Sequence, residues 1–261
     1  MKKPKWVVKK EQARRDAASA TVWLFGLHAV RDALLNPKRE KLRLILTKNA
    51  FDRLGDAVQA GGVEPEMADA RKFSAPLDSG SVHQGAALEV KALDWGRLRD
   101  LVGGDGPRTV LCLDRVTDPH NVGAILRSAE VFGASAVIAP ARHAAPETGA
   151  LAKTASGALE RQPYLRVKNL AAAMEELHKE GFFLIGLDGE AETTLEEALE
   201  GTGERIALVL GAEGPGLREK TKDTCDMLAK IEYAGAFGSL NVSNAAAVSL
   251  YATGRQAKAR G

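Results

Sequence analysis

Short runs of apolar residues recur along the second half of the chain, each followed by a longer segment that mixes apolar and polar positions. The runs show no apolar–polar alternation, which is typical of a parallel sheet covered on both faces. We predict strands at residues 109–113, 135–139, 182–187, 205–210 and 228–232. We predict helices at residues 121–132, 148–156, 169–180, 216–222 and 241–257. This alternation predicts an α/β domain.

The first half of the chain shows the same alternation on a smaller scale. Apolar residues at helical spacing predict a helix over residues 28–35, which Asn36-Pro37 ends. A strand is expected at 42–47, a helix at 51–60, a short strand from Val63 and another strand at 86–90. These elements predict a second, smaller α/β domain.

Glycine and proline separate the two blocks. The segment Gly103-Gly104-Asp105-Gly106-Pro107 is typical of an interdomain linker or of a long surface turn within one domain. We favour the linker because an apolar strand follows at once. The expected organisation is a basic arm at residues 1–20, a small domain at 21–92, a linker at 93–107 and a larger domain at 108–261.

Composition narrows the class of protein. The chain has 261 residues, of which 45% are hydrophobic, so it can bury a core and is not a disordered chain. No apolar run is long enough to span a membrane, and the N-terminus has no signal-peptide core. Cys112 and Cys225 form no C-x-x-C pair, so neither a disulfide framework nor a zinc site is indicated. We expect a cytoplasmic protein without metal or membrane contact.

Charge adds one local feature. The formal net charge is only +2, yet residues 1–20 hold seven basic side chains against Glu11 and Asp16. Such an arm can contact the phosphates of a nucleic acid. It can equally be a solubilising tail, and the sequence leaves both interpretations open.

The common signatures of nucleotide and metal enzymes are absent from the sequence. There is no G-x-x-x-x-G-K-[ST], no H-E-x-x-H and no G-x-S-x-G, and no G-x-G-x-x-G opens the second block. Gly211, Gly214 and Gly216 have a different spacing, which alone is typical of a tight turn. The five histidines are scattered, and His120 is interpreted as a turn residue rather than a metal ligand or base.

Three polar segments remain, each at the end of a predicted strand. In the first, Asn121 suits a helix N-cap and Gly123 leaves room for a ligand or a second backbone. The helix that follows places Arg127 on a face of small residues with Ala124 and Ser128, from which it can reach into a cleft. Taken alone, this segment fits a surface arginine paired with an acid better.

The other two segments lie further along the chain. Glu213 is framed by glycines at the carboxyl end of a strand, where open α/β sheets bind ligands; it could also be an acid at the start of a helix. Ser239, Asn241 and Ser243 gather hydrogen-bonding groups at the start of an alanine-rich helix, where simple N-capping is the alternative interpretation.

Together, the three segments resemble the motifs of the SpoU-type RNA 2′-O-ribose methyltransferases of the SPOUT superfamily. Those motifs read approximately N-x-G-x-x-x-R, G-x-E-x-x-G and S-L-N-V-S-x-A. They stand here in the same order, as 121–127, 211–216 and 239–245. The first motif is most similar to members that methylate a guanosine of 23S rRNA. Segments 26–30 and 82–85 resemble the small N-terminal RNA-binding domain of several members, a fold shared with some ribosomal proteins.

The resemblance implies a fold that periodicity alone does not suggest. It implies a C-terminal SPOUT domain with a parallel sheet and a deep trefoil knot, beside a small N-terminal α/β RNA-binding domain. Dimerisation through the knot region and binding of S-adenosylmethionine are implied as well, with Gly211, Ile231 and Leu240 contacting the cofactor largely by backbone. One departure is that Glu232-Tyr233 stands where the family commonly has proline and methionine.

The implied reaction is methyl transfer to the ribose 2′-hydroxyl of a guanosine in 23S rRNA. By resemblance, Arg127 activates the hydroxyl, while Asn121, Glu213, Ser239 and Asn241 orient Arg127 and the nucleotide. Because an arginine side chain, with a pKa above about 12, is already protonated and cannot readily accept a proton, we favour electrostatic stabilisation by Arg127. The alternatives are a tRNA substrate, a non-catalytic RNA-binding assembly factor, and a generic doubly wound module that binds a small anion.

Overall fold

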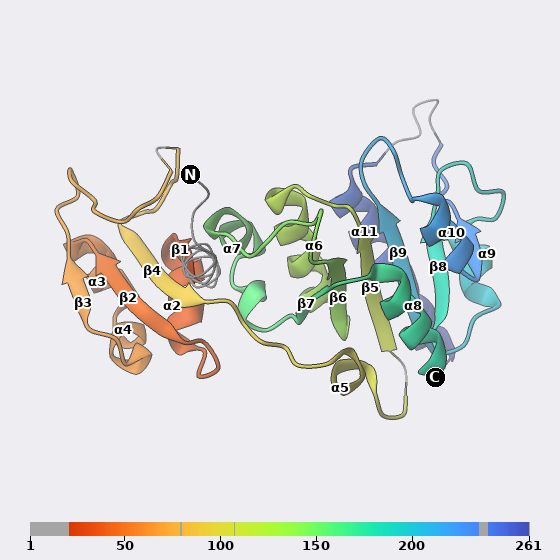
Figure 1. The fold of residues 1–261 in the computed structure, drawn as a ribbon, viewed down its shortest axis with the longest axis horizontal. Coiled ribbons are helices and arrows are strands. Elements are labelled where there is room, and N and C mark those ends of the chain that lie inside the picture. Colours follow the sequence, from red (N-terminus) through yellow and green to blue (C-terminus); the bar gives the residue numbers. More distant parts are fainter. Residues whose placement is uncertain (1–20, 79, 107, 235–239, 261) are drawn as a thin grey trace, which may run out of the picture. The chain divides into compact units, whose positions relative to one another are not determined.

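The structure of the protein is a computed structural model that describes residues 21–78, 80–106, 108–234 and 240–260 (Figure 1). The described chain divides into two compact units. The first holds the described residues up to Asp94 together with Glu147–Lys153, and the second holds the described residues of 95–146 and 154–261. Each unit has its own sheet.

The sheet of the first unit has four strands in the order β1-β4-β2-β3, in which β4 is antiparallel to β1 and β2. The strands are β1 (Thr21–Phe25), β2 (Lys41–Leu46), β3 (Pro65–Met67) and β4 (Ala86–Lys91). The helices are α2 (Leu27–Leu35), α3 (Lys48–Leu54) and α4 (Asp56–Gly61). Buried leucines such as Leu24, Leu44 and Leu88 fill the core.

The first unit confirms the predicted helix at 28–35 and the strands at 42–47 and 86–90 with small shifts of their ends. The predicted helix at 51–60 is wrong as a single element, because Gly55 at φ 50° separates α3 from α4. The short strand expected from Val63 begins at Pro65. Strand β1 was not predicted.

The sheet of the second unit has six strands in the order β10-β8-β9-β5-β6-β7, and every strand pair in it is parallel (Figure 1). The strands are β5 (Arg108–Asp114), β6 (Ala136–Pro140), β7 (Tyr164–Val167), β8 (Phe183–Leu187), β9 (Arg205–Gly211) and β10 (Met227–Ala229). The predicted parallel sheet is therefore confirmed. All six carboxyl ends meet at one edge of the sheet, which we call the carboxyl edge.

Helices cover the sheet of the second unit. These elements are α5 (Leu98–Val102), α6 (Pro119–Val131), η1 (Ala158–Glu160), α8 (Leu170–Lys179), α9 (Leu195–Glu200), α10 (Glu219–Thr224) and α11 (Val242–Arg260), whereas most of α7 (Gly149–Ala155) belongs to the first unit. Helices α8 and α10 pack together, and α11 packs against α6 and α9. Val110 and Cys112 share a core with α8, which leaves the alternate residues of β5 for the opposite face.

Most predicted elements of this unit are confirmed, but helix α9 was not predicted and four other differences occur. The strand predicted at 228–232 ends at Ala229, and the helix predicted from residue 216 begins at Glu219. Strand β7 was missed because it is a four-residue edge strand whose apolar run is interrupted by exposed Arg166. The segment expected as a linker at 93–107 contains α5, whose Leu98 and Val102 are buried in the core.

Burial also sets the chemistry of the two cysteines. Both are free thiols, with Cys112 completely buried and Cys225 half-buried beside the same core. Burial raises the pKa of Cys225 to about 12 and raises that of Cys112 further. Both side chains are therefore apolar filling rather than reactive thiolates.

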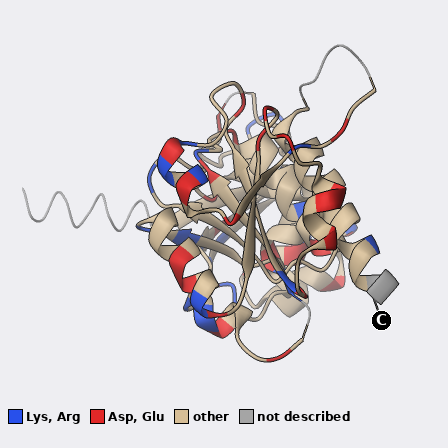
Figure 2. Cartoon of the chain, turned by 90° about the vertical axis from the view of Figure 1, so that its right-hand side faces the viewer, with Lys and Arg blue, Asp and Glu red and all other residues tan. Residues whose placement is uncertain are grey.

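Two features are absent from the described residues. No helix among them has the length and apolar character needed to cross a membrane. No three histidine, cysteine, aspartate or glutamate side chains of the described ranges gather in a way that could hold a metal ion. Basic and acidic positions are interspersed along the helices seen in Figure 2.

Candidate active site

Residues from the three sequence motifs meet at the carboxyl edge around one carboxylate. Glu213, in the turn after β9, accepts hydrogen bonds from the side-chain amides of Asn121 (3.2 Å) and Asn241. Asn241 Nδ2 also donates to Asn121 Oδ1 at 3.0 Å, and the backbone N–H of Val242 points to Glu213 Oε1 at 3.4 Å. We call these three side chains the Glu213 cluster. It joins the start of α6, the β9 turn and the start of α11.

The position of Asn121 corrects one sequence expectation. Helix α6 begins at Pro119, and its N-cap is Asp118, whose carboxylate accepts the backbone N–H of His120 at 3.0 Å. Asn121 therefore lies inside the first turn, so the N-cap interpretation is wrong. Its side chain is left to reach Glu213, which explains why an amide stands there.

Asn241 performs both of the roles considered for it. Its Oδ1 accepts the backbone N–H of Ser243 at 2.9 Å and the hydroxyl of Ser243 at 2.6 Å, as expected of a residue that caps α11. Its Nδ2 remains available for Glu213 and Asn121. The cap fixes the rotamer of Asn241, and the fixed rotamer aims the amide at the carboxylate.

Glycine is required where the β9 turn closes on itself. Gly211, the last residue of β9, lies against Gly216, and Ala212 pairs with Gly216 in an isolated bridge. A Cβ atom at Gly211 would lie 2.2 Å from the carbonyl carbon of Gly216 and 2.4 Å from the backbone nitrogen of Leu217. Gly214 and Gly216 have φ angles of 82° and 67°, which favour glycine. The turn therefore presents bare backbone to the cavity beside it.

A buried carboxylate holds the far end of the same turn. Asp114, the last residue of β5, is completely buried, and it pairs in register with Gly211. It accepts the Thr221 hydroxyl (2.7 Å), the Arg218 backbone N–H (3.2 Å) and the Arg218 guanidinium (2.7 Å from Nη2). Because a buried charge is stable only when it is paired and hydrogen-bonded, this arrangement fixes Arg218 where the turn enters α10.

A cavity of about 700 Å³ opens beside the Glu213 cluster, within the usual size range of small-molecule sites. It is lined by the carboxyl ends of β8, β9 and β10 and by the start of α11. Gly211, Ile231 and Leu240, the three positions expected to contact a cofactor, all line it, and so do Glu213 and Asn241. The cavity thus lies where open α/β sheets bind their ligands.

The cavity wall also contains charges that sequence reasoning missed. Asp188, directly after β8, pairs with Lys222 Nζ at 2.6 Å, and this contact holds the pKa of Asp188 below its ordinary value. Glu190, Lys230 and Tyr233 line the wall as well. Asp188 follows a predicted strand, so the carboxyl-edge rule could have found it; Lys222 carries no local signal.

Two expected site residues are not part of the Glu213 cluster. Arg127 is exposed on α6, six residues after Asn121, which is about 9 Å further along a helix axis. Among the described residues it has no recorded hydrogen-bond or ion-pair partner, so the surface ion pair considered for it is not formed. Ser239 lies outside the described residues, as does the basic arm at 1–20.

The departure at Glu232-Tyr233 leaves the cavity intact. Both residues follow the end of β10 and are exposed, and Tyr233 contributes to the cavity wall. The proline and methionine common in the family are therefore replaced by polar side chains at the rim rather than in the core.

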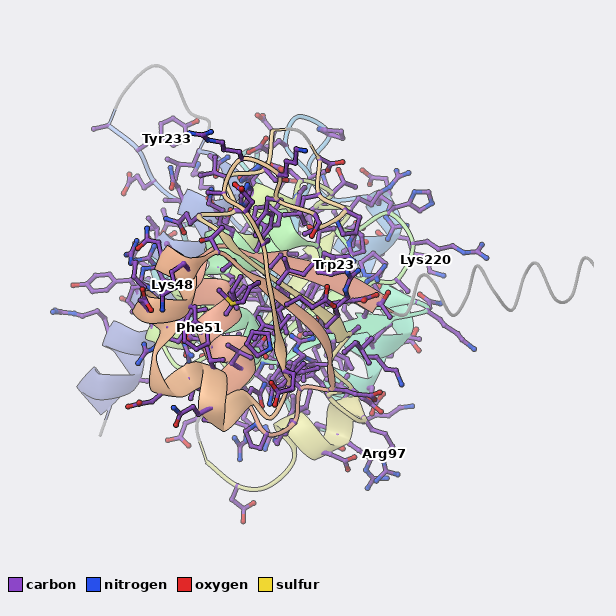
Figure 3. All side chains as sticks on the ribbon, turned by 90° about the vertical axis from the view of Figure 1, so that its left-hand side faces the viewer. Trp23, Lys48, Phe51, Arg97, Lys220 and Tyr233 are labelled. Carbon is purple, nitrogen blue, oxygen red and sulfur yellow. The ribbon has the colours of Figure 1, made fainter. Side chains whose placement is uncertain are left out.

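The first unit brings together segments 26–30 and 82–85, which resemble the RNA-binding domain of the family. The backbone N–H of Leu27 at the start of α2 donates to Gln84 Oε1 at 3.1 Å, and Gly26 N–H donates to Ala86 O at 3.1 Å. The ring of His83 stacks on Phe73 at 4.0 Å between ring centroids. On α3, Lys48 lies over the ring of Phe51 (Figure 3). Gln84 has φ 53°, so the loop is held in an uncommon conformation.

The fold and the site define a class: an α/β protein with a ligand cavity at the carboxyl edge and a polar cluster beside it. Comparison with known proteins gives the family. The family model described as "SpoU rRNA Methylase family" matches residues 108–251, and "RNA 2'-O ribose methyltransferase substrate binding" matches residues 23–95. The chain therefore belongs to the SpoU rRNA methylase family.

Named relatives cover nearly the whole chain. It is 40% identical over 242 residues to the 23S rRNA (guanosine-2'-O-)-methyltransferase RlmB of Vibrio vulnificus, with 90% of this chain and 96% of that protein covered. It is also 40% identical over 241 residues to RlmB of Escherichia coli K12, with 89% and 98% covered.

Solved structures agree in fold. The SpoU methyltransferase AviRb from Streptomyces viridochromogenes, in complex with AdoMet, has a TM-score of 0.76 at 22% identity, with 93% of this chain and 92% of that chain covered. The AdoMet-bound rRNA methyltransferase from Sinorhizobium meliloti has a TM-score of 0.74 at 22% identity, with 94% and 90% covered.

We expect Gly211→Ala to weaken cofactor binding while Gly203→Ala does not. The new methyl group at 211 would overlap the backbone of Gly216, at a cost of about 1–3 kcal/mol, or roughly 5- to 150-fold in affinity. Gly203 has nothing within 4 Å of an added Cβ and lies outside the cavity. Calorimetric titration with S-adenosylmethionine measures both. Equal affinities for the two variants would contradict the close-contact explanation.

Proposed function

We propose that the protein transfers a methyl group from S-adenosylmethionine to the ribose 2′-hydroxyl of a guanosine in 23S rRNA. The observation that carries this proposal is the Glu213 cluster, in which residues of three family motifs meet beside the cavity. The substrate rests on the 40% identity to proteins named for this activity over nine-tenths of the chain.

The residues that line the cavity fit the cofactor. Bare backbone around Gly211 and Gly216 can approach an adenosyl group closely, and Ile231 and Leu240 offer apolar contact. The carboxylates of Asp188, Glu190 and Glu213 outnumber the ammonium groups of Lys222 and Lys230 in this wall, which suits a ligand with ammonium and sulfonium charges. When bound, S-adenosylmethionine supplies a methyl group on an excellent leaving group.

Arg127 is the proposed catalytic residue. Its guanidinium stays protonated at every physiological pH, so it cannot serve as an ordinary base. It instead binds a phosphate next to the reacting ribose and stabilises the negative charge that develops on the 2′ oxygen as the hydroxyl proton passes to solvent water. Its exposure and its lack of a recorded protein partner among the described residues leave all five N–H donors available to RNA.

The Glu213 cluster is proposed to orient the reacting groups. Glu213 holds Asn121 and Asn241 by hydrogen bonds, so the starts of α6 and α11 keep a fixed relation. Asn121 lies on the same helix as Arg127, so the cluster also sets the position of the guanidinium. Ser239, in the same motif as Asn241, is proposed to contribute a hydroxyl to the nucleotide site. Such alignment is what methyl transfer requires.

The domain roles follow the same proposal. Residues 21–92 form the RNA-binding domain, residues 1–20 an additional phosphate-binding arm, 93–107 a linker and 108–261 the methyltransferase domain. The match of the substrate-binding model to residues 23–95 supports this assignment. The cytoplasm is the proposed compartment, since the free thiols Cys112 and Cys225 suit reducing conditions.

A knotted, dimeric second unit completes the proposal. Ala246 and Ser249 of α11 are completely buried, which suits the tight packing of a trefoil knot. Exposed apolar side chains on α6 and α11 support a homodimer through this region: Val131 is 71% exposed, Tyr251 55% and Val248 41%. The ring of Phe132 packs on that of Tyr251 at 6.1 Å, so the patch is continuous across the two helices.

Incubation with methyl-labelled S-adenosylmethionine and unmodified total RNA tests the activity. After separation of rRNA from tRNA and digestion to nucleosides, we expect the label in 2′-O-methylguanosine from large-subunit rRNA. Label in tRNA would replace the substrate and keep the chemistry. Cofactor binding without label in either RNA would support the non-catalytic assembly factor instead.

Arg127→Ala tests the catalytic assignment. We expect turnover to fall by about a hundredfold or more, because one stabilising donor set is lost in the transition state. The affinity for S-adenosylmethionine should stay unchanged, since Arg127 does not line the cavity. Single-turnover methyl transfer and calorimetry measure the two quantities. A variant with the wild-type rate would remove Arg127 from the mechanism.

Tyr251→Glu tests the dimer. A charge in the apolar patch should convert the dimer to the 27.7 kDa monomer, because a buried unpaired carboxylate is costly. Met67→Glu is the matched control, as Met67 is also 55% exposed but lies on β3 of the first unit. Light scattering after size-exclusion chromatography gives the masses. If both variants stay dimeric, the interface lies elsewhere.

A further inference from the structure

Charge is divided along the carboxyl edge of the second unit. Acidic side chains outnumber basic ones at the cavity: Asp188 and Glu190 after β8 and Glu213 after β9 stand against Lys222 and Lys230. Basic side chains follow the strands on the other half of the sheet: Arg115 after β5, Arg142 and His143 after β6, and Lys168 after β7. The order β8-β9-β5-β6-β7 makes these two runs contiguous.

The basic half is free to bind a ligand. Arg115, Arg142 and Lys168 are all exposed. Within the described ranges none of the three has an ion-pair or hydrogen-bond partner for its side chain, whereas Arg43, Arg97 and Arg161 each pair with an acid. The one acid in the loop after β5, Asp118, is committed to the N-cap of α6.

The loops that carry these cations are held in place. Arg115 has φ 62° and His143 has φ 64°. Residues other than glycine keep this backbone conformation only when the surrounding structure imposes it. Arg166, at the end of β7, donates to the carbonyl of Ala141 at 2.5 Å and so ties the loop after β6 to β7. Fixed loops lose less entropy when they bind.

We propose that the RNA strand crosses the carboxyl edge over β5, β6 and β7, with Arg115, Arg142 and Lys168 contacting its phosphates. Neighbouring strands lie about 4.8 Å apart, so the three loops cover roughly 10 Å. That length corresponds to about three nucleotides of a stacked strand, at about 3.4 Å per nucleotide along its axis. We call these three residues the phosphate track.

The distribution of charge along the carboxyl edge determines from which side the RNA approaches. Carboxylates after β8 and β9 suit the cationic cofactor and repel a phosphate backbone, so RNA is kept to the β5–β7 half. Arg127, on the helix between β5 and β6, lies on that half as well. The track therefore delivers the ribose to the boundary between the two halves, where the Glu213 cluster stands. This inference rests on the proposed function.

Binding of transcribed, unmodified 23S rRNA to the full chain at several salt concentrations tests the track. Each lost phosphate contact should weaken binding about five- to eightfold at 0.1 M salt. In the variant Arg115→Ala/Arg142→Ala/Lys168→Ala, the slope of log affinity against log salt should become shallower by about 2–3. Affinity for S-adenosylmethionine should not change, because none of the three lines the cavity.

Lys179→Ala is the matched control. Lys179 is an exposed cation at the end of α8, which leads into the amino end of β8, so its loss removes one charge from the opposite edge of the sheet. It should leave the salt slope unchanged. An unchanged slope in the triple variant, or an equal per-charge effect of Lys179→Ala, would overturn the track.

Methyl transfer separates this inference from the proposed function. If the wild type does not methylate rRNA, the proposed function fails. If it does, while the triple variant binds RNA with the wild-type salt slope, only the phosphate track fails. A triple variant that methylates more slowly at low RNA concentration, and recovers the wild-type rate at saturating RNA, would support the track, since it acts by binding rather than by chemistry.

Discussion

The site depends on one carboxylate that three distant parts of the chain share. Glu213 accepts the amide of Asn121 from α6 and the amide of Asn241 from the cap of α11, so it joins elements about 120 residues apart. The two amides also bond to each other, since Asn241 Nδ2 donates to Asn121 Oδ1. The carboxylate therefore aligns the helix that carries Arg127 with the segment that closes the cavity, and removal of its charge would disconnect both.

The backbone around Glu213 allows this role only because both ends of the turn are fixed. Gly211 lies too close to Gly216 for any side chain at position 211. Asp114 accepts hydrogen bonds from Arg218 and Thr221 just after the turn. The buried Asp114 has no contact with the cavity, yet it decides where the turn ends. A completely buried carboxylate is costly, and the hydrogen bonds of Asp114 to Arg218 and Thr221 give it a structural role at the end of β5.

The sequence predicts the parallel sheet and the motif residues, but not the hydrogen bonds that bring these residues together. Apolar runs identify the central strands, whereas edge strand β7 has four residues interrupted by exposed Arg166 and gives no such run. Gly211, Ile231 and Leu240 line the cavity, and only the family resemblance predicted them as cofactor contacts. Asn121 was assigned to a cap that Asp118 forms, because both residue types cap helices well. The Asp114–Arg218 pair spans 104 residues and leaves no local pattern.

The division of charge along the carboxyl edge follows from the chemistry that must occur there. A cationic methyl donor and an anionic RNA backbone have to meet at a single ribose, and one field cannot attract both. Acids after β8 and β9 and cations after β5, β6 and β7 resolve this conflict by position. A formal net charge of only +2 is then no argument against RNA binding, since attraction depends on where the charges lie along the edge rather than on their sum.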